Sequence, residues 1–307
     1  MTVASVDRLA IPPSLAPAYA HCERIAREHY ENFPVASRLL PAAMRPHVAA
    51  VYAFARAADD FADEGTLEPA ERYRLLDGWR ALLHAPAPAI GGPAADPSDL
   101  VFAAVANTRA QCGLDIQLFD DLLSAFRQDV ETRRYAEWAG VLDYCRRSAN
   151  PVGRLVLGIA GHRGPEVERA SDALCTALQL ANFWQDLGID FRRGRLYIPA
   201  EIYGRRRALE TDLARGVWSD AWAESLTEAV RRTRLLFDEG RPVADLVTGR
   251  LRFELRVTWL GGRTILDRAA EKGRNPFETR PALTKTDLPG LVWRAVRWLG
   301  EGRRARR

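Results

Sequence analysis

Residues 52–64 read YAFARAADDFADE, and this stretch sets the expectation for the fold. Apolar residues lead into four acidic side chains that fall within six positions. At about 100° per residue, one face of a helix here carries four polar side chains: Tyr52, Arg56, Asp59 and Asp63. Carboxylates spaced i, i+4 repel each other, so this face needs a compensating cation. A solvated acidic patch is the alternative.

Helical spacing of apolar residues continues along nearly the whole chain, whereas alternating strand patterns are scarce. The Pro- and Gly-rich stretch 85–97 is expected to be a surface loop between helices. We therefore expect an all-α fold with one domain, 1–307, although a length of 307 residues alone suggests two. The expected helices are 17–31, 43–64, 69–84, 98–111, 115–130, 135–161, 166–191, 219–239, 243–272 and 288–300.

Charge is divided unevenly along the chain. The net charge of +4 combines 15 bases and 20 acids in residues 1–150 with 29 bases and 20 acids in residues 151–307. These halves carry −5 and +9, which argues against a uniformly basic nucleic-acid binder.

Targeting and metal-binding patterns are scarce. The first residues lack the pattern of a signal peptide, and no apolar run approaches the roughly 18 residues that span a bilayer. The expectation is a cytoplasmic protein, soluble or attached to a membrane face. The four cysteines form no C-x-x-C pair and the five histidines no H-E-x-x-H pair, which argues against disulfides and zinc.

A second acidic stretch, residues 179–190, reads QLANFWQDLGID. Its polar residues again share one helix face: Gln179, Asn182, Asp186 and Asp190. Two such carboxylate pairs could face each other and bridge Mg²⁺ ions that hold a diphosphate, with arginines on its oxygens. The alternative is two unrelated helix faces.

These residues match three ordered motifs of a known family, and the chain resembles the squalene/phytoene synthases, all-α head-to-head prenyl synthases. The similarity spans about residues 17–270. The motif Y-x-x-x-R-x-x-D-D-x-x-D matches Tyr52, Arg56, Asp59, Asp60 and Asp63; Q-x-x-N-x-x-x-D-x-x-x-D matches Gln179, Asn182, Asp186 and Asp190; R-R-G-R-x-Y-x-P matches Arg192, Arg193, Gly194, Arg195, Tyr197 and Pro199.

The resemblance implies an isoprenoid-synthase-type helical bundle around a central cavity, and it implies roles for single residues. Mg²⁺ would be held by Asp59, Asp63, Asn182, Asp186 and Asp190. The substrate would be bound by Arg56, Asn182, Gln179, His29 and Arg193. A solvated surface arginine is the alternative for Arg193, and a capped or core histidine for His29. The two tyrosines, Tyr52 and Tyr197, join the aspartates as catalytic candidates, with core packing as the alternative for both.

Departures from the family pattern favour one branch. Gln185 stands where the family usually has an arginine, and Ile189 where it usually has an acid. Segments 31–37, 182–186 and 259–262 look like the bacterial hydroxysqualene synthases of hopanoid biosynthesis. That similarity implies a carbon–oxygen lyase that converts presqualene diphosphate and water to hydroxysqualene and diphosphate, without NADPH. The alternatives are a prenyltransferase that condenses two allylic diphosphates to presqualene diphosphate or phytoene, and a non-catalytic helical binding or assembly partner.

The C-terminal stretch combines an apolar stripe with tryptophans and arginines. The stripe is Leu288, Leu291, Val292, Ala295, Val296 and Leu299. A basic amphipathic helix with tryptophan can lie on an anionic membrane surface, here the inner face of the cytoplasmic membrane. The alternative is a last helix, about 288–307, packed on the domain. Other pathway enzymes are possible partners; nucleic acid is not expected.

Overall fold

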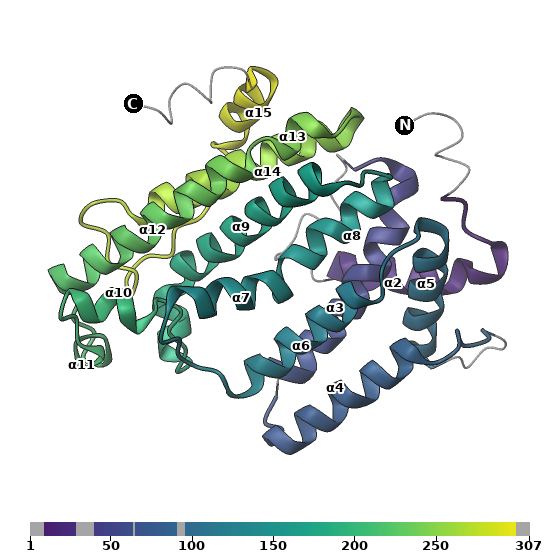
Figure 1. Cartoon of the computed structure of the whole chain (residues 1–307), viewed down its shortest axis with the longest axis horizontal. Helices are drawn as coiled ribbons and strands as arrows, with labels where there is room; N and C mark the ends of the chain where they lie inside the picture. The colour runs from purple at the N-terminus through teal and green to yellow at the C-terminus, as the bar shows by residue number, and fades with distance from the viewer. Residues whose placement is uncertain (1–8, 29–39, 64, 91–95, 299–307) are drawn as a thin grey trace. The chain divides into compact units, whose positions relative to one another are not determined.

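The computed structural model describes residues 9–28, 40–63, 65–90 and 96–298 (Figure 1). In these ranges the regular elements are helices, and β-pairing is limited to an isolated bridge between Arg134 and Leu196. The all-α prediction is confirmed. The chain divides into two compact units: residues 1–131, 151–165 and 248–251 form unit 1, and residues 132–150, 166–247 and 252–307 form unit 2. The single-domain prediction stays a prediction.

Unit 1 is built from helices whose apolar sides pack together. Its core helix, α3, ends in the first acidic motif and packs against α2, α4, α5 and α6. The elements are η1 (Pro13–Leu15), α2 (Ala16–Glu28), η3 (Ala42–Met44), α3 (Arg45–Asp63), α4 (Pro69–His84), α5 (Pro97–Cys112), α6 (Gln117–Glu131) and most of α8 (Asn150–Ala160).

Phe54 anchors α3 in this unit. Its ring is fully buried and lies 5.2 Å from the ring of Phe119 and 6.0 Å from those of Trp79 and Phe102. Trp79 also donates its indole N–H to the carbonyl oxygen of Phe54 at 3.3 Å. Because Phe54 and Arg56 are two residues apart, this cluster fixes the rotation of α3 and hence the direction of the motif face.

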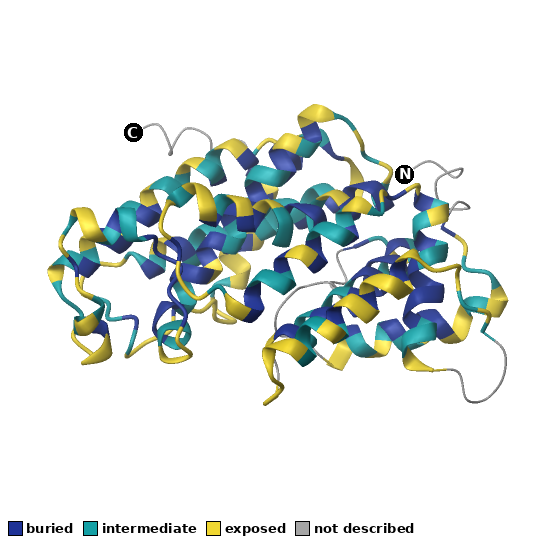
Figure 2. Cartoon of the chain, turned by 60° about the horizontal axis from the view of Figure 1, so that its bottom comes forward, coloured by how far each residue is buried: buried dark blue, intermediate teal, exposed yellow. Residues whose placement is uncertain are grey.

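Unit 2 is organised around α9, the 28-residue helix that carries the second motif. Trp184 of α9 is buried and donates its indole N–H to Thr233 of α12 at 2.8 Å. The elements are α7 (Trp138–Ser148), α9 (Pro165–Arg192), α10 (Ala200–Arg205), α11 (Glu210–Ala214), α12 (Asp220–Gly240), α13 (Val243–Leu246), most of α14 (Gly249–Ala269) and α15 (Leu288–Val296). Figure 2 shows how buried and exposed residues alternate around the helices.

Most predicted helices are found, with corrections at their ends. The predicted helix 135–161 is two helices that meet at Ala149, because Pro151 fits the first turn of a helix but not its interior. The predicted helix 243–272 is interrupted at Val247, which is extended, ahead of Gly249 at φ +66°. The cap at the start of α5 is Asp96, whose carboxylate accepts from the backbone of Ser98. The short helices α10 and α11 are not predicted from the sequence.

The four cysteines all lie in the described ranges, and none of them forms a disulfide there. Cys22, Cys112 and Cys145 are buried, and Cys175 is partly exposed. Burial raises the pKa of the Cys22 thiol to about 12, so this side chain behaves as a small apolar residue at neutral pH.

Gly240 tests the packing of α12 on α9. A Cβ at this position would lie 2.5 Å from the backbone nitrogen of Leu174, so Gly240→Ala forces backbone movement. We expect it to destabilise the protein by about 1–3 kcal/mol. The matched control is Gly78→Ala on α4, where nothing lies within 4 Å and the change should stabilise by roughly 0.5–1 kcal/mol. Urea unfolding midpoints measure both, and equal midpoints would contradict the close contact.

Candidate functional site

The first acidic motif lies at the C-terminal end of α3, where its carboxylates are paired with an arginine of the same helix. A guanidinium nitrogen of Arg56 lies 2.6 Å from Asp60 Oδ1 and another lies 3.7 Å from Asp59 Oδ2. The Arg56 side chain is only 14% exposed, whereas that of Asp59 is 47% exposed. The compensating cation that the repulsion requires is therefore supplied locally, and Asp59 faces solvent.

Tyr52 sits one turn before Arg56 and is half-buried. Burial raises the pKa of its hydroxyl above the ordinary value of 10.0; Arg56 opposes that shift, and the carboxylates of Asp59 and Asp60 add to it. The group is consequently a neutral hydrogen-bond donor at neutral pH, which is the form that a role toward a phosphate oxygen would need.

The second acidic motif lies on the C-terminal half of α9, and its cation comes from far along the chain. The guanidinium of Arg280 binds both carboxylate oxygens of Asp186: Nε donates to Oδ1, and a terminal nitrogen donates to Oδ2 at 3.1 Å. The hydrogen bond to Asp186 raises the pKa of Arg280, and the charge of Asp190 adds to it. Sequence reasoning missed Arg280.

Residues 275–287 form the segment that carries Arg280, and we call it the Arg280 segment. Its backbone follows α9: Gln185 donates its side-chain amide to the carbonyl of Pro281 at 2.6 Å, and Arg192 donates to the carbonyl of Phe277 at 2.5 Å. A Cβ on Gly188 would overlap the carbonyl oxygen of Pro276. The glycine therefore permits the segment to approach the helix closely.

The other predicted residues differ in their surroundings. Asn182 and Arg193 are exposed, and Gln179 and Asp190 are partly exposed. Tyr197 is 8% exposed, and its ring stacks on that of Phe183 at 3.6 Å. This burial fits the packing alternative, and a catalytic role for Tyr197 stays a prediction. His29 lies outside the described residues.

The chemistry of these side chains fits Mg²⁺. In the described ranges no three His, Cys, Asp or Glu side chains gather into a metal site by themselves. Mg²⁺ is commonly held by one or two carboxylates together with waters and substrate phosphate, and each motif offers a pair one helical turn apart. Asp186 already holds a cation, the guanidinium of Arg280, with both of its oxygens.

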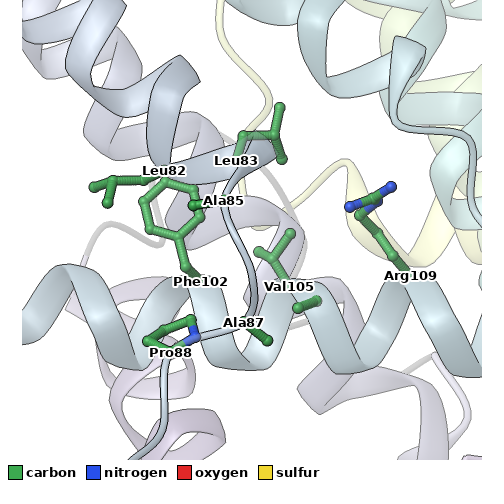
Figure 3. Close-up of a pocket in the computed structure, with 9 residues that line it drawn as sticks. Leu82, Leu83, Ala85, Ala87, Pro88, Phe102, Val105 and Arg109 are labelled. Atoms are coloured by element: carbon green, nitrogen blue, oxygen red, sulfur yellow. The ribbon is translucent and has the colours of Figure 1, made fainter.

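A small pocket in unit 1 is unrelated to these motifs. Figure 3 shows its lining by the end of α4, the following loop and α5, including Leu82, Pro88 and Phe102. Its volume of about 20 Å³ is room for about one water molecule, so it cannot hold a long prenyl chain.

Comparison with known proteins agrees with the motifs. Residues 26–287 match the squalene/phytoene synthase family. The chain is 39% identical over 210 residues to the hydroxysqualene synthase of Zymomonas mobilis, covering 67% of each protein. It is 35% identical over 265 residues to that of Sinorhizobium fredii, covering 86% of this chain and 87% of the relative.

Among solved structures, the chain is similar to the squalene synthase HpnC from Alicyclobacillus acidocaldarius. The TM-score is 0.78 at 39% sequence identity, and the match covers 89% of this chain and 100% of that one. The similarity therefore extends from the sequence to the fold.

The raised pKa of Tyr52 is open to direct measurement. Because burial disfavours the phenolate, the signal lost in Tyr52→Phe should belong to a group that ionises above pH 10.0. Ultraviolet difference titration of the two proteins measures it. A lost signal centred at or below the ordinary tyrosine range would contradict the buried position of the hydroxyl.

Proposed function

The chain belongs to the squalene/phytoene synthase family, and from this premise we propose that it converts presqualene diphosphate and water into hydroxysqualene and diphosphate, in hopanoid biosynthesis. It is an enzyme of this family. The observation that carries the proposal is the pair of acidic helices, each with a carboxylate i, i+4 pair and an arginine, in a chain similar to hydroxysqualene synthases over most of its length.

In this reaction the chain's own residues bind and orient the diphosphate. Mg²⁺ would be held by Asp59 and Asp63 on α3, and by Asp186, Asp190 and Asn182 on α9. When bound, Mg²⁺ supplies Lewis-acid neutralisation of the departing diphosphate. The substrate is bound in addition by four other side chains: Arg56, Gln179, His29 and Arg193. Tyr52 and Tyr197 donate hydrogen bonds to the diphosphate or face the hydrocarbon chain.

The balance of the reaction needs no reductant. The carbon–oxygen bond to diphosphate breaks, water supplies the new hydroxyl oxygen, and a proton is released. We therefore propose that NADPH is not used. A prenyltransferase that joins two allylic diphosphates remains the second candidate, favoured by the same family motifs.

Incubation of the purified protein with presqualene diphosphate and Mg²⁺, without NADPH, tests the proposal. Hydroxysqualene should appear, and Asp59→Asn or Asp186→Asn should lower its rate by at least about a hundredfold, because loss of charge stabilisation at the leaving group costs several kcal/mol. Asp77→Asn is the matched control, since Asp77 is exposed on α4 and pairs with Arg127.

Inertness toward presqualene diphosphate together with consumption of farnesyl diphosphate would replace the proposal with the condensation reaction. Unchanged turnover in both aspartate variants would exclude the metal role, and absence of any turnover would favour a binding partner.

We propose further that the protein works in the cytoplasm, bound peripherally to the inner face of the cytoplasmic membrane, where a C30 substrate dissolves. In the described ranges no helix has the length and apolarity that crossing a bilayer would require. The support comes from α15, which is apolar on two sides. One side packs on the rest of unit 2, where Trp298, just past the helix, is buried and donates its indole N–H to Asp245 at 3.1 Å.

The adjoining side of α15 is apolar and exposed in the described part of the chain. Four large side chains on this nine-residue helix are between 45% and 63% exposed: Leu288, Val292, Trp293 and Val296. The sequence 285–307 carries seven bases and two acids, a net charge of +5. An anionic lipid surface complements both the apolar side and the charge.

Binding to vesicles tests this surface. The full chain should sediment with vesicles that contain phosphatidylglycerol and less with pure phosphatidylcholine, and salt should weaken the binding. Trp293→Ser should lower the affinity at least about tenfold, since burying one large apolar side chain is worth about 2 kcal/mol. Leu235→Ser is the control, because Leu235 is 52% exposed on α12. Equal affinities of the two variants would contradict a role for α15.

A further inference from the structure

We propose that Gln185 is a positioning residue that holds the Arg280 segment on α9, and that Arg280 is thereby a built-in counter-cation of the second motif, which a metal ion displaces from Asp186. This inference rests on the proposed function only in its choice of metal. It is based on contacts within unit 2 and on the uncharged side chain at position 185.

The Arg280 segment docks on one face of α9, next to the motif face. Three positions of the helix meet it, Gln185, Gly188 and Arg192. Their spacing of three and four residues places them in one row. Gln185 and Arg192 donate to the carbonyls of Pro281 and Phe277, and Gly188 leaves room for the carbonyl of Pro276. The ring of Phe277 also meets that of Phe191 edge-on at 6.0 Å. The helix thus recognises the backbone path of the segment.

The segment is fixed at its far end as well. Arg268 of α14 binds the carboxylate of Asp287 at 2.5 and 3.0 Å and the carbonyl of Ala282 at 2.5 Å. The Asp287 carboxylate accepts in addition from the backbone N–H of Thr284 at 2.6 Å. With both sides of Arg280 held, its guanidinium has a defined position on Asp186.

The side chain at position 185 cannot itself neutralise the neighbouring Asp186. Gln185 has no charge, and its side-chain amide donates a hydrogen bond to the carbonyl of Pro281. The positive charge beside Asp186 belongs to Arg280, which lies 94 positions further along the chain. Gln185 therefore acts on the motif through the segment.

Arg280 competes with a metal ion for the same atoms. Both oxygens of Asp186 accept from its guanidinium, so a metal ion that coordinates Asp186 takes at least one of them. The positive charge beside the site also repels the ion. Removing Arg280 should consequently strengthen binding of the metal alone, and weakening the hold on the segment should do so in part.

The experiment measures binding of Mn²⁺ alone to the full chain by electron paramagnetic resonance. Arg280→Met should tighten binding about tenfold, and Gln185→Met, which keeps length but has no donor, about threefold. In the Arg280→Met background the second change should have no further effect, because Gln185 acts through Arg280. Arg231→Met is the control, since Arg231 pairs with Glu228 on α12 and this change should leave the affinity unchanged. Circular dichroism verifies that each variant is folded.

Hydrogen exchange supplies an independent readout. Mn²⁺ should speed exchange of the amides of residues 276–283 in the wild-type chain, and Gln185→Met should speed it without metal. Arg280→Lys, which keeps the charge but not the two-pronged geometry, should bind Mn²⁺ with intermediate affinity.

Several results would overturn the inference. Unchanged or weaker Mn²⁺ binding in Arg280→Met does so, as do additive effects of the two substitutions. If Asp186→Asn abolishes Mn²⁺ binding while the Arg280 and Gln185 variants bind normally, this inference fails and the proposed function stands. If the coupling is present but presqualene diphosphate is inert, only the proposed function fails.

Discussion

Two carboxylates one turn apart on the same face of a helix repel each other, and the surroundings of both acidic motifs follow from this repulsion. On α3 the compensating charge is Arg56, from the same helix. On α9 the residue before the aspartate is the uncharged Gln185. The charge that compensates Asp186 comes from Arg280, which lies on a separate segment of the chain. On α3 a single side chain of the same helix is enough, whereas on α9 the whole Arg280 segment has to be held in place.

Holding the Arg280 segment in place limits which residues α9 can carry, because the helix has neighbours or functional groups on three sides. One side packs into the core through Trp184, and another carries Asp186 and Asp190. The side that meets the Arg280 segment needs the donors of Gln185 and Arg192 and the missing side chain of Gly188. A helix used on three sides tolerates few substitutions, because a change that suits one neighbour displaces another.

Local patterns in the sequence were enough to predict most helices and the shared face of each motif, because helical periodicity is a property of short stretches. Arg280 could not be predicted in this way. The chain has 44 lysines and arginines, of which only Lys272 and Lys285 are lysine, so no single arginine stands out, and the partner is 94 positions away. The available signal was the irregular, Pro-containing stretch around Pro276 and Pro281, together with an uncharged residue at position 185. The short helices α10 and α11 rest on tertiary contacts in the same way, since Trp222 of α12 donates to the carbonyl of Leu209 and its ring lies 4.9 Å from that of Tyr203.

Several arginines of the second half serve such contacts. Arg268 joins the carbonyl of Ala282 to the carboxylate of Asp287. Arg256 reaches both the carbonyl of Ala295 and Asp245, and Arg241 reaches the carbonyl of Trp298 while lying over its ring at 4.4 Å. A planar guanidinium makes such paired contacts in a fixed geometry, whereas an ammonium group offers a single charged point. These three arginines therefore hold non-helical backbone and α15 against the rest of unit 2, and positive charge used in this way is not a surface for nucleic acid.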